Sequence, residues 1–378
     1  MYLEAAKEDL VIINPQWLGT EIIGKLLSYE VVACAPESGR MSFDDLRNLF
    51  PRLDGTDLVN LLEALNICVQ CSVSADVEFA FPMLNVLESP SAIWTNAELR
   101  DDITCGGIRV VSPPEFSEQF THIYPRVVVG LHHAIKGNNN ITLTEWSTKC
   151  KIQMEGISTV LSLVRNGQAL DIECRGSKVQ SGTVFAVQQR IFDIVVDVFQ
   201  QCCPGIYLEQ NPISPTHLTQ NKAMPHIYTP RDILMAQLEG RTTLQPDNNT
   251  SESLTDVIAF GSSDIFSSLI LGIDLHISNL ALYSRCQLAA LLDPHFQTAG
   301  EQDKFAAVLG LDKLQLSELA EASQLSNTDK MLALWSQNPT STIRLLCQKF
   351  NEYERPYAAT LLLSLSPMFI CTNHHKVF

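Results

Sequence analysis

The spacing of apolar residues divides the chain into stretches of helical period and stretches of strand period. Near the N-terminus, a short apolar run is followed by an apolar stripe of helical spacing. Two further apolar stripes of helical spacing follow. The first begins after Ser42, which resembles a capping box with Asp45, and the second begins after Asp54. Residues 77–84 alternate in a manner typical of an extended segment. Helices closed by a short pair of strands predict a small winged-helix-like unit.

Beyond this unit the apolar pattern changes to the period of β-strands. Runs rich in β-branched residues are separated by Pro, Gly and Asn at 108–111, 127–131 and 141–144. Around residue 172 apolar and charged side chains alternate strictly, which is typical of a strand with one face in the core. Residues 183–200 then keep helical spacing over about five turns. The pattern predicts an α+β layer unit.

The last part of the chain is predicted to be helical. Residues 240–254 are almost entirely polar and rich in turn residues, so we expect a linker there. Strand signals end near residue 280, and short helical segments follow to about residue 366. The expected domains are a winged-helix-like unit at 1–98, an α+β unit at 99–239, a linker at 240–280, an all-α bundle at 281–366 and a tail at 367–378.

The composition limits the kinds of molecule that the protein is expected to bind and the cellular compartment in which it is expected to lie. The chain has 378 residues, with 42 acidic against 26 basic side chains and a formal net charge of −16. Because phosphate binding needs a clustered positive field, this balance argues against nucleic acid as a partner. The longest apolar stretch is shorter than the roughly 20 residues of a membrane-spanning helix, and the N-terminus lacks a signal-peptide core. We expect a cytoplasmic protein, without membrane insertion, whose 11 cysteines are reduced thiols.

Motifs that would carry catalysis are missing from the sequence. It contains no phosphate-binding loop of an NTPase, no dinucleotide fingerprint and no catalytic loop of a kinase. Cys68 and Cys71 have the spacing of half a zinc site, but no second pair completes four ligands. His132 and His133, if on a strand, would point to opposite faces. The sequence therefore predicts no catalytic residue, no metal, no cofactor and a chain that is not an enzyme.

Two groups of residues carry a resemblance to a known family. Leu332 and Trp335, followed by an Ala-Ala-x-x-Leu helix, resemble the signature of a death domain, a six-helix bundle. Asn14-Pro15-Gln16-Trp17-Leu18 resembles the start of the COR region of Roco proteins. Together with Gly106 to Val111 and Tyr228 to Asp232, these segments resemble, in order, the C-terminal part of death-associated protein kinases.

This resemblance implies a regulatory region that binds proteins in apoptosis or autophagy signalling. Members of that family also have kinase, ankyrin and GTPase domains. These domains have no counterpart in this sequence, so no catalytic role is carried over to any residue. Death domains associate through surface charges, and the candidate contacts are Asp303, Lys304, Asp312, Lys313, Arg344, Lys349, Glu352, Glu354 and Arg355. The alternative is a unit that dimerises through the COR-like region and regulates a GTPase or kinase in the same polypeptide. An unrecognised enzyme is the third hypothesis.

Overall fold

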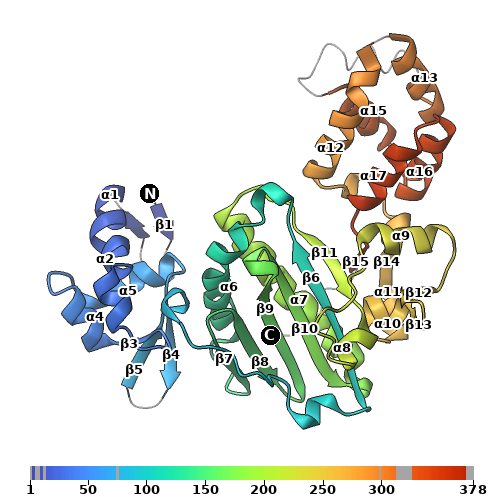
Figure 1. Ribbon diagram of the computed structural model, residues 1–378. Helices are drawn as coiled ribbons and strands as arrows, with labels where there is room; N and C mark the ends of the chain where they lie inside the picture. Colours follow the sequence, from blue (N-terminus) through green and yellow to red (C-terminus); the bar gives the residue numbers. More distant parts are fainter. Residues whose placement is uncertain are drawn as a thin grey trace.

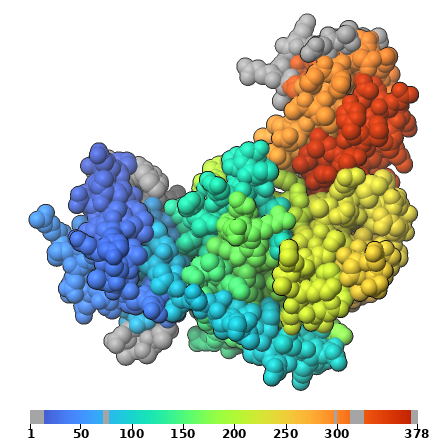
Figure 2. Space-filling view, in the orientation of Figure 1, coloured from blue at the N-terminus to red at the C-terminus, as the bar shows by residue number. Residues whose placement is uncertain are grey.

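The computed structural model describes residues 2–4, 9–11, 14–73, 76–297, 299–311 and 326–371. Three hydrophobic cores organise them. We call the parts around these cores the N-terminal unit (residues 14–85), the sheet unit (103–271 with 367–371) and the helical unit (272–366). Figure 1 shows the N-terminal unit in blue, the sheet unit in cyan through green to yellow with its residues 367–371 in red, and the helical unit in orange to red, and Figure 2 shows the same parts in a space-filling view. This mixture of helices and antiparallel sheets confirms the α+β class.

The N-terminal unit packs helices on a small antiparallel sheet. Its elements are α1 (Pro15–Trp17), the π-helical η1 (Leu18–Ile23), α2 (Gly24–Leu26), α3 (Tyr29–Cys34), β3 (Arg40–Ser42), α4 (Phe43–Leu49), α5 (Gly55–Ala64), β4 (Val69–Val73) and β5 (Asp76–Ala80). The sheet order is β3-β5-β4, and β1 (Tyr2–Glu4) pairs separately with β2 (Asp9–Val11). Ser42 and Asp45 form the expected capping box, and Asp54 caps α5.

The sheet unit is built on six antiparallel strands in the order β11-β6-β10-β9-β8-β7. They are β6 (Ile103–Val111), β7 (Ile141–Glu145), β8 (Lys149–Met154), β9 (Ile157–Val164), β10 (Ala169–Ser177) and β11 (Glu209–Ile213). Helices α6 (Gln119–Ile135) and α7 (Ser181–Cys202) pack on one face. Along β10 the buried residues Leu170, Ile172 and Cys174 join this core, as their alternation predicts.

Residues 127–131, expected as a strand, lie in the middle of α6 instead. Seven side chains of this helix are buried, among them Phe120, Ile123, Val127 and Leu131 at spacings of three and four. Burial of this apolar face against α7 outweighs the preference of the valines for strands. The prediction that His132 and His133 sit on opposite strand faces is therefore wrong.

Residues 240–254, expected as a linker, form a packed hairpin of β12 (Thr243–Asp247) and β13 (Thr250–Ser253). The reason is a buried carboxylate. Glu252 accepts hydrogen bonds from the Ser214 hydroxyl at 2.7 Å, the Thr216 backbone N–H at 2.8 Å and the Tyr228 hydroxyl at 2.7 Å. The polar composition that indicated a linker therefore supplies a satisfied hydrogen-bond network.

The remaining elements of the sheet unit lie between this hairpin and the helical unit. They are α8 (Pro215–Thr219), α9 (Pro230–Leu238), α10 (Leu254–Ala259), α11 (Ser263–Ser268) and β14 (Leu269–Leu271). Strand β14 pairs with β15 (Phe369–Cys371), so the expectation that residues from 367 form a tail without strands is wrong for 369–371. Gly272 follows β14 directly, and a Cβ there would lie 2.1 Å from the Pro367 carbonyl oxygen.

The helical unit contains five described α-helices: α12 (Leu282–Leu292), α13 (Ala299–Leu309), α15 (Asn327–Trp335), α16 (Ile343–Glu352) and α17 (Pro356–Ser364). Their shared core also contains Ile273, Leu275 and Ile277, which precede α12, and Leu234 from α9. The helical unit thus draws on residues before the expected boundary at 281. Within the ranges that the structure describes, no helix is both long enough and apolar enough to cross a membrane.

Candidate functional site

Some of the charged residues of the helical unit lie around one carboxylate, that of Glu301 on α13. Lys304 donates a hydrogen bond to it at 2.6 Å, the Tyr353 hydroxyl donates at 3.1 Å, and the Arg355 guanidinium lies 3.8 Å away. The hydrogen bond from Lys304 and then the one from Tyr353 lower the pKa of Glu301 from its ordinary value. We call these four residues the Glu301 cluster. It joins α13 to the turn between α16 and α17.

The other candidate contact residues are distributed over the same unit. Lys349 pairs with Glu352 at 2.8 Å on α16, and Arg344, at the start of that helix, pairs with Asp274 at 3.0 Å. Glu354 is exposed in the turn before α17, and Asp303 is half-buried on α13. The two remaining candidates, Asp312 and Lys313, lie outside the described residues. The structure therefore brings Lys304 and Arg355 to one carboxylate and does not bring Arg344 to them.

Sequence reasoning missed three residues that organise this surface: Glu301, Tyr353 and Asp274. A local signal existed for Glu301, because it stands three residues before Lys304 on a helix, a spacing at which opposite charges meet. No local signal existed for Asp274, which is 70 residues from Arg344 along the chain.

The residues that carried the family resemblance have structural roles. The Asn14 side chain caps α1 by accepting the Trp17 backbone N–H at 3.1 Å, and Pro15 occupies the first helical position. Trp17 is half-buried, and Leu18 is buried in the N-terminal core.

The death-domain-like signature lies in the helical core. Leu332 and Trp335 are buried there. The Ser341 hydroxyl donates a 2.6 Å hydrogen bond to the Trp335 carbonyl oxygen, which ties the end of α15 to the loop that precedes α16.

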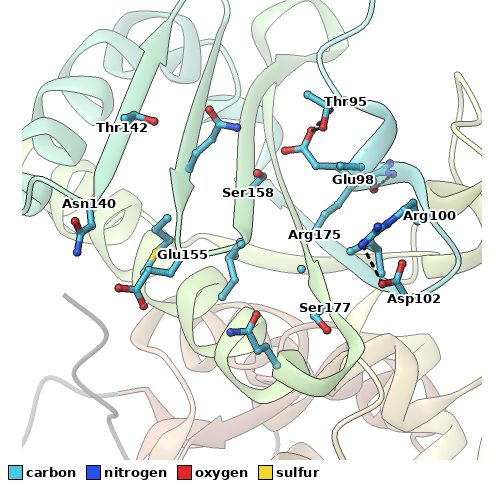
Figure 3. A pocket seen from close by; sticks show the side chains of 18 residues that line it. Thr95, Glu98, Arg100, Asp102, Asn140, Thr142, Glu155, Ser158, Arg175 and Ser177 are labelled. Carbon is cyan, nitrogen blue, oxygen red and sulfur yellow. Dashed lines mark hydrogen bonds and ion pairs between the residues drawn. The ribbon is translucent and has the colours of Figure 1, made fainter.

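A second candidate site is a polar pocket of about 620 Å³ at one end of the six-stranded sheet. One wall is the segment of residues 86–102, which we call the strap. Figure 3 shows Glu98 of the strap beside Ser158 and Arg175 of the sheet, with Arg100 paired to Asp102 nearby. Lys151 donates to Glu98 at 2.8 Å.

The strap is fixed mainly by charges that pair within the protein. The Trp94 ring contacts two cations: the Lys151 Nζ lies 5.2 Å from the ring centre, and the Arg175 guanidinium lies 4.5 Å from it. Burial alone would raise the pKa of Glu98, but hydrogen bonds from Lys151, Ser158 and Thr95 outweigh it and lower the pKa to about 2. Lys151 compensates the charge of Glu98, and Arg175 donates hydrogen bonds to the Leu218 carbonyl oxygen and the Asn221 side chain, so these groups serve the fold.

The polar face of the sheet has one carboxyl that is not compensated in this way. Glu173 lies on β10 next to Val160 and Gly107 of the neighbouring strands. Burial, followed by the nearby Asp171 carboxylate, raises the pKa of Glu173 from 4.5 to about 7. Asp171 itself is bound by both ends of the Arg109 guanidinium, each at 2.7 Å.

Glu173→Gln is expected to stabilise the protein at pH 8 by an amount on the order of 2 kcal/mol, and to change little at pH 4. A carboxyl whose pKa is raised on folding binds its proton more tightly in the folded state. Stability is therefore lost as pH rises from 4.5 to about 7. Urea denaturation of both proteins across this range measures the effect. The exposed Glu155→Gln is the control, and the same pH dependence in wild type and Glu173→Gln would contradict the assignment.

Comparisons with known proteins find relatives of this chain, among them the following protein. The chain is 29% identical over 372 residues to a protein described as "Death-associated protein kinase dapk-1" from Caenorhabditis elegans. The alignment takes in 96% of this chain but 26% of that protein, so the chain spans about a quarter of the length of the curated relative. No protein-family model matches the chain. The chain is thus similar to one region of a death-associated protein kinase.

This similarity corrects one expectation from the sequence. The absence of catalytic motifs led to the prediction that the chain is not an enzyme. Similarity over 96% of the chain to a protein that is named a kinase overturns that prediction.

Proposed function

We propose that this chain is a regulatory and protein-interaction region of a death-associated-kinase-like polypeptide. Its helical unit binds signalling proteins through exposed charges, and the N-terminal and sheet units form the scaffold that carries it. This proposal includes the finer interpretation of a COR-like scaffold followed by a death-domain-like bundle. Kinase activity in the polypeptide is what the region would regulate.

Two findings support the proposal. The similarity to a death-associated protein kinase extends over nearly the whole chain, so all three units belong to the matched region. In addition, the five described helices of the last unit share one core that contains Leu332 and Trp335, the residues of the death-domain-like signature.

The observation that carries the proposal is the exposure of paired charges on the helical unit. The side chain of Lys304 is 68% exposed, and that of Glu352 is 56% exposed. Ion pairs in contact with water contribute little to the stability of a folded chain, about 0–1 kcal/mol. Lys304 can therefore turn from Glu301 to a carboxylate of another protein at small cost, and Lys349, whose side chain is 25% exposed, lies on α16 beside the exposed Glu352. A surface that carries both signs suits recognition of a surface with the opposite arrangement.

Reversing the charge of Lys304 and Lys349 together is expected to weaken partner binding by at least about tenfold. Binding would be measured against a panel of purified death domains at low and at physiological ionic strength. Wild-type affinity should fall with added salt, because exposed charges are screened. Lys304→Glu and Lys349→Glu are preferred to changes at Arg355, since Arg355 also stacks on the Tyr353 ring at 5.3 Å and its loss would disturb packing.

Lys178→Glu is the matched control, because Lys178 is an exposed lysine of the sheet unit. It should bind the panel as the wild type does. Binding by no member of the panel, or equal binding by the wild type and the double variant, would contradict the proposed contact surface. In the full-length polypeptide, the double variant should also change kinase activity toward a peptide substrate if the region is regulatory.

A further inference from the structure

The N-terminal unit meets the sheet unit along α6 and β7, and Figure 1 shows it beside these two elements. Val69, Cys71 and Ala80 of the small sheet form a buried cluster there with Val129 of α6. We call this contact region the joint. Its apolar cluster is small, so the polar groups around it contribute to how firmly the two units are held together.

One carboxylate at the joint lacks the partners that a buried charge needs. The side chain of Glu145, the last residue of β7, is 5% exposed, and neither of its carboxylate oxygens has a hydrogen-bond partner among the described residues. Arg40 of β3 lies 3.8 Å from one oxygen, but it also lies 3.9 Å from Glu78 of β5. Because burying a charge without hydrogen bonds is costly, a further donor that carries a positive charge would be favourable here.

His132 of α6 is placed to be that donor. Its Nε2 atom lies 3.5 Å from the second oxygen of Glu145, and this atom is also buried without a hydrogen-bond partner among the described residues. The side chain of His132 is 11% exposed, so water reaches the pair poorly. His132 also stands in the last turn of α6, where the helix dipole favours a positive charge. The imidazolium form of His132 therefore supplies both the hydrogen and the charge that Glu145 lacks.

The other titratable groups that face Glu145 do not supply this charge. They are Tyr124 of α6, Cys150 of β8 and Cys71 of β4. Burial raises the pKa of each of these groups, to about 12 for Cys150, so all three stay neutral at physiological pH. Within the described part of the chain, compensation of Glu145 thus depends on Arg40 and His132.

We propose that the joint is a pH-sensitive contact, which a salt bridge between protonated His132 and Glu145 closes. The bridge needs the proton on His132, so its contribution is present on the acid side and is lost as pH rises through the titration of the ring. The N-terminal unit is therefore held more firmly on the sheet unit at lower pH. This role goes beyond the proposed protein-binding surface, which lies on the helical unit.

Cys71 makes opening of the joint measurable, because its side chain is buried against Val129. The full chain is labelled with iodoacetamide at about pH 6 and at about pH 8, and the rate at each cysteine is measured by peptide mass spectrometry. The exposed Cys34 of the same unit corrects for the change of thiol reactivity with pH. Cys68, which is buried in the core of the N-terminal unit, reports unfolding of that unit itself.

In the wild type, the labelling rate of Cys71 relative to Cys34 is expected to be at least about threefold higher at the higher pH, whereas Cys68 relative to Cys34 should change much less. His132→Gln and Glu145→Gln each remove one side of the salt bridge. Either variant should reduce the difference for Cys71 to less than about 1.5-fold. Thermal melting checks that both variants are folded.

His133→Gln is the matched control, because His133 is the next residue of the same helix. Partial burial lowers the pKa of His133, with Glu63 of α5 as the opposing influence, so His133 does not gain a more tightly bound proton on folding. The control should keep at least the wild-type difference. The proposal is overturned if Cys71 relative to Cys34 is labelled equally at both pH values in the wild type, if His132→Gln and Glu145→Gln keep the difference, or if Cys68 follows Cys71.

Discussion

Glu252→Ala is expected to lower the free energy of unfolding by about 3–5 kcal/mol. The side chain of Glu252 is buried, and it accepts hydrogen bonds from Ser214, Thr216 and Tyr228. Alanine would leave three donors without an acceptor in a place that water does not reach. The loss should be measured by urea denaturation, and hydrogen exchange should show that the β12–β13 hairpin opens first.

Two further variants test whether the loss of stability comes from the hydrogen bonds to Glu252. Glu252→Gln keeps one acceptor oxygen in place and should cost less than the alanine variant. Glu88→Ala removes an exposed carboxylate and should change stability by less than about 0.5 kcal/mol. If Glu252→Ala unfolded at the same urea concentration as the wild type, the hairpin would be a loose loop and not a part of the core.

Trp335→Ala is expected to destabilise the helical unit by about 3–5 kcal/mol. The Trp335 side chain is 5% exposed and belongs to a core shared with Phe305, Leu346 and Leu362. Removing the indole leaves a cavity that neighbouring side chains fill only in part. Hydrogen exchange of α15, α16 and α17 should increase strongly, while the central strands β6 and β10 should change much less.

Leu282→Ala is the matched control, because Leu282 is an apolar side chain of the same unit that is 66% exposed. Its truncation should change stability by less than about 0.5 kcal/mol. If the two variants melted alike, or if α15–α17 kept wild-type protection in Trp335→Ala, Trp335 would not belong to the core of this unit.

Features of the fold that depend on near neighbours were predicted well from the sequence. The capping box of Ser42 and Asp45 joins residues three apart, and the helix after Asp54 begins at its cap. The alternation along β10 and the apolar stripe of α7 also reflect a single element and its one buried face. In these cases the local pattern and the tertiary packing favour the same structure.

Features that depend on distant residues could not be predicted. The donors to Glu252 lie 24 to 38 residues away along the chain, so a polar stretch that looks like a linker is a packed hairpin. The valines of α6 favour a strand locally, but the face that they share with Phe120 and Leu131 is buried against α7. Tertiary burial decides the structure in both segments.

The candidate contact residues of the helical unit also include some features that the sequence predicts and some that it does not. The sequence identified charged residue types such as Lys304 and Arg355, because charge is a property of single residues. It did not identify Glu301 as their common partner, since the Tyr353 hydrogen bond to Glu301 spans 52 residues.

The pairing of β14 with β15 gives the helical unit an unusual place in the chain. The chain leaves the sheet unit after Leu271 and returns to it at Met368, which is buried in the sheet core. The helical unit is therefore an insertion between two neighbouring strands, with entry and exit side by side. During synthesis the sheet core stays incomplete until residues 368–371 have emerged and the whole insertion has been made.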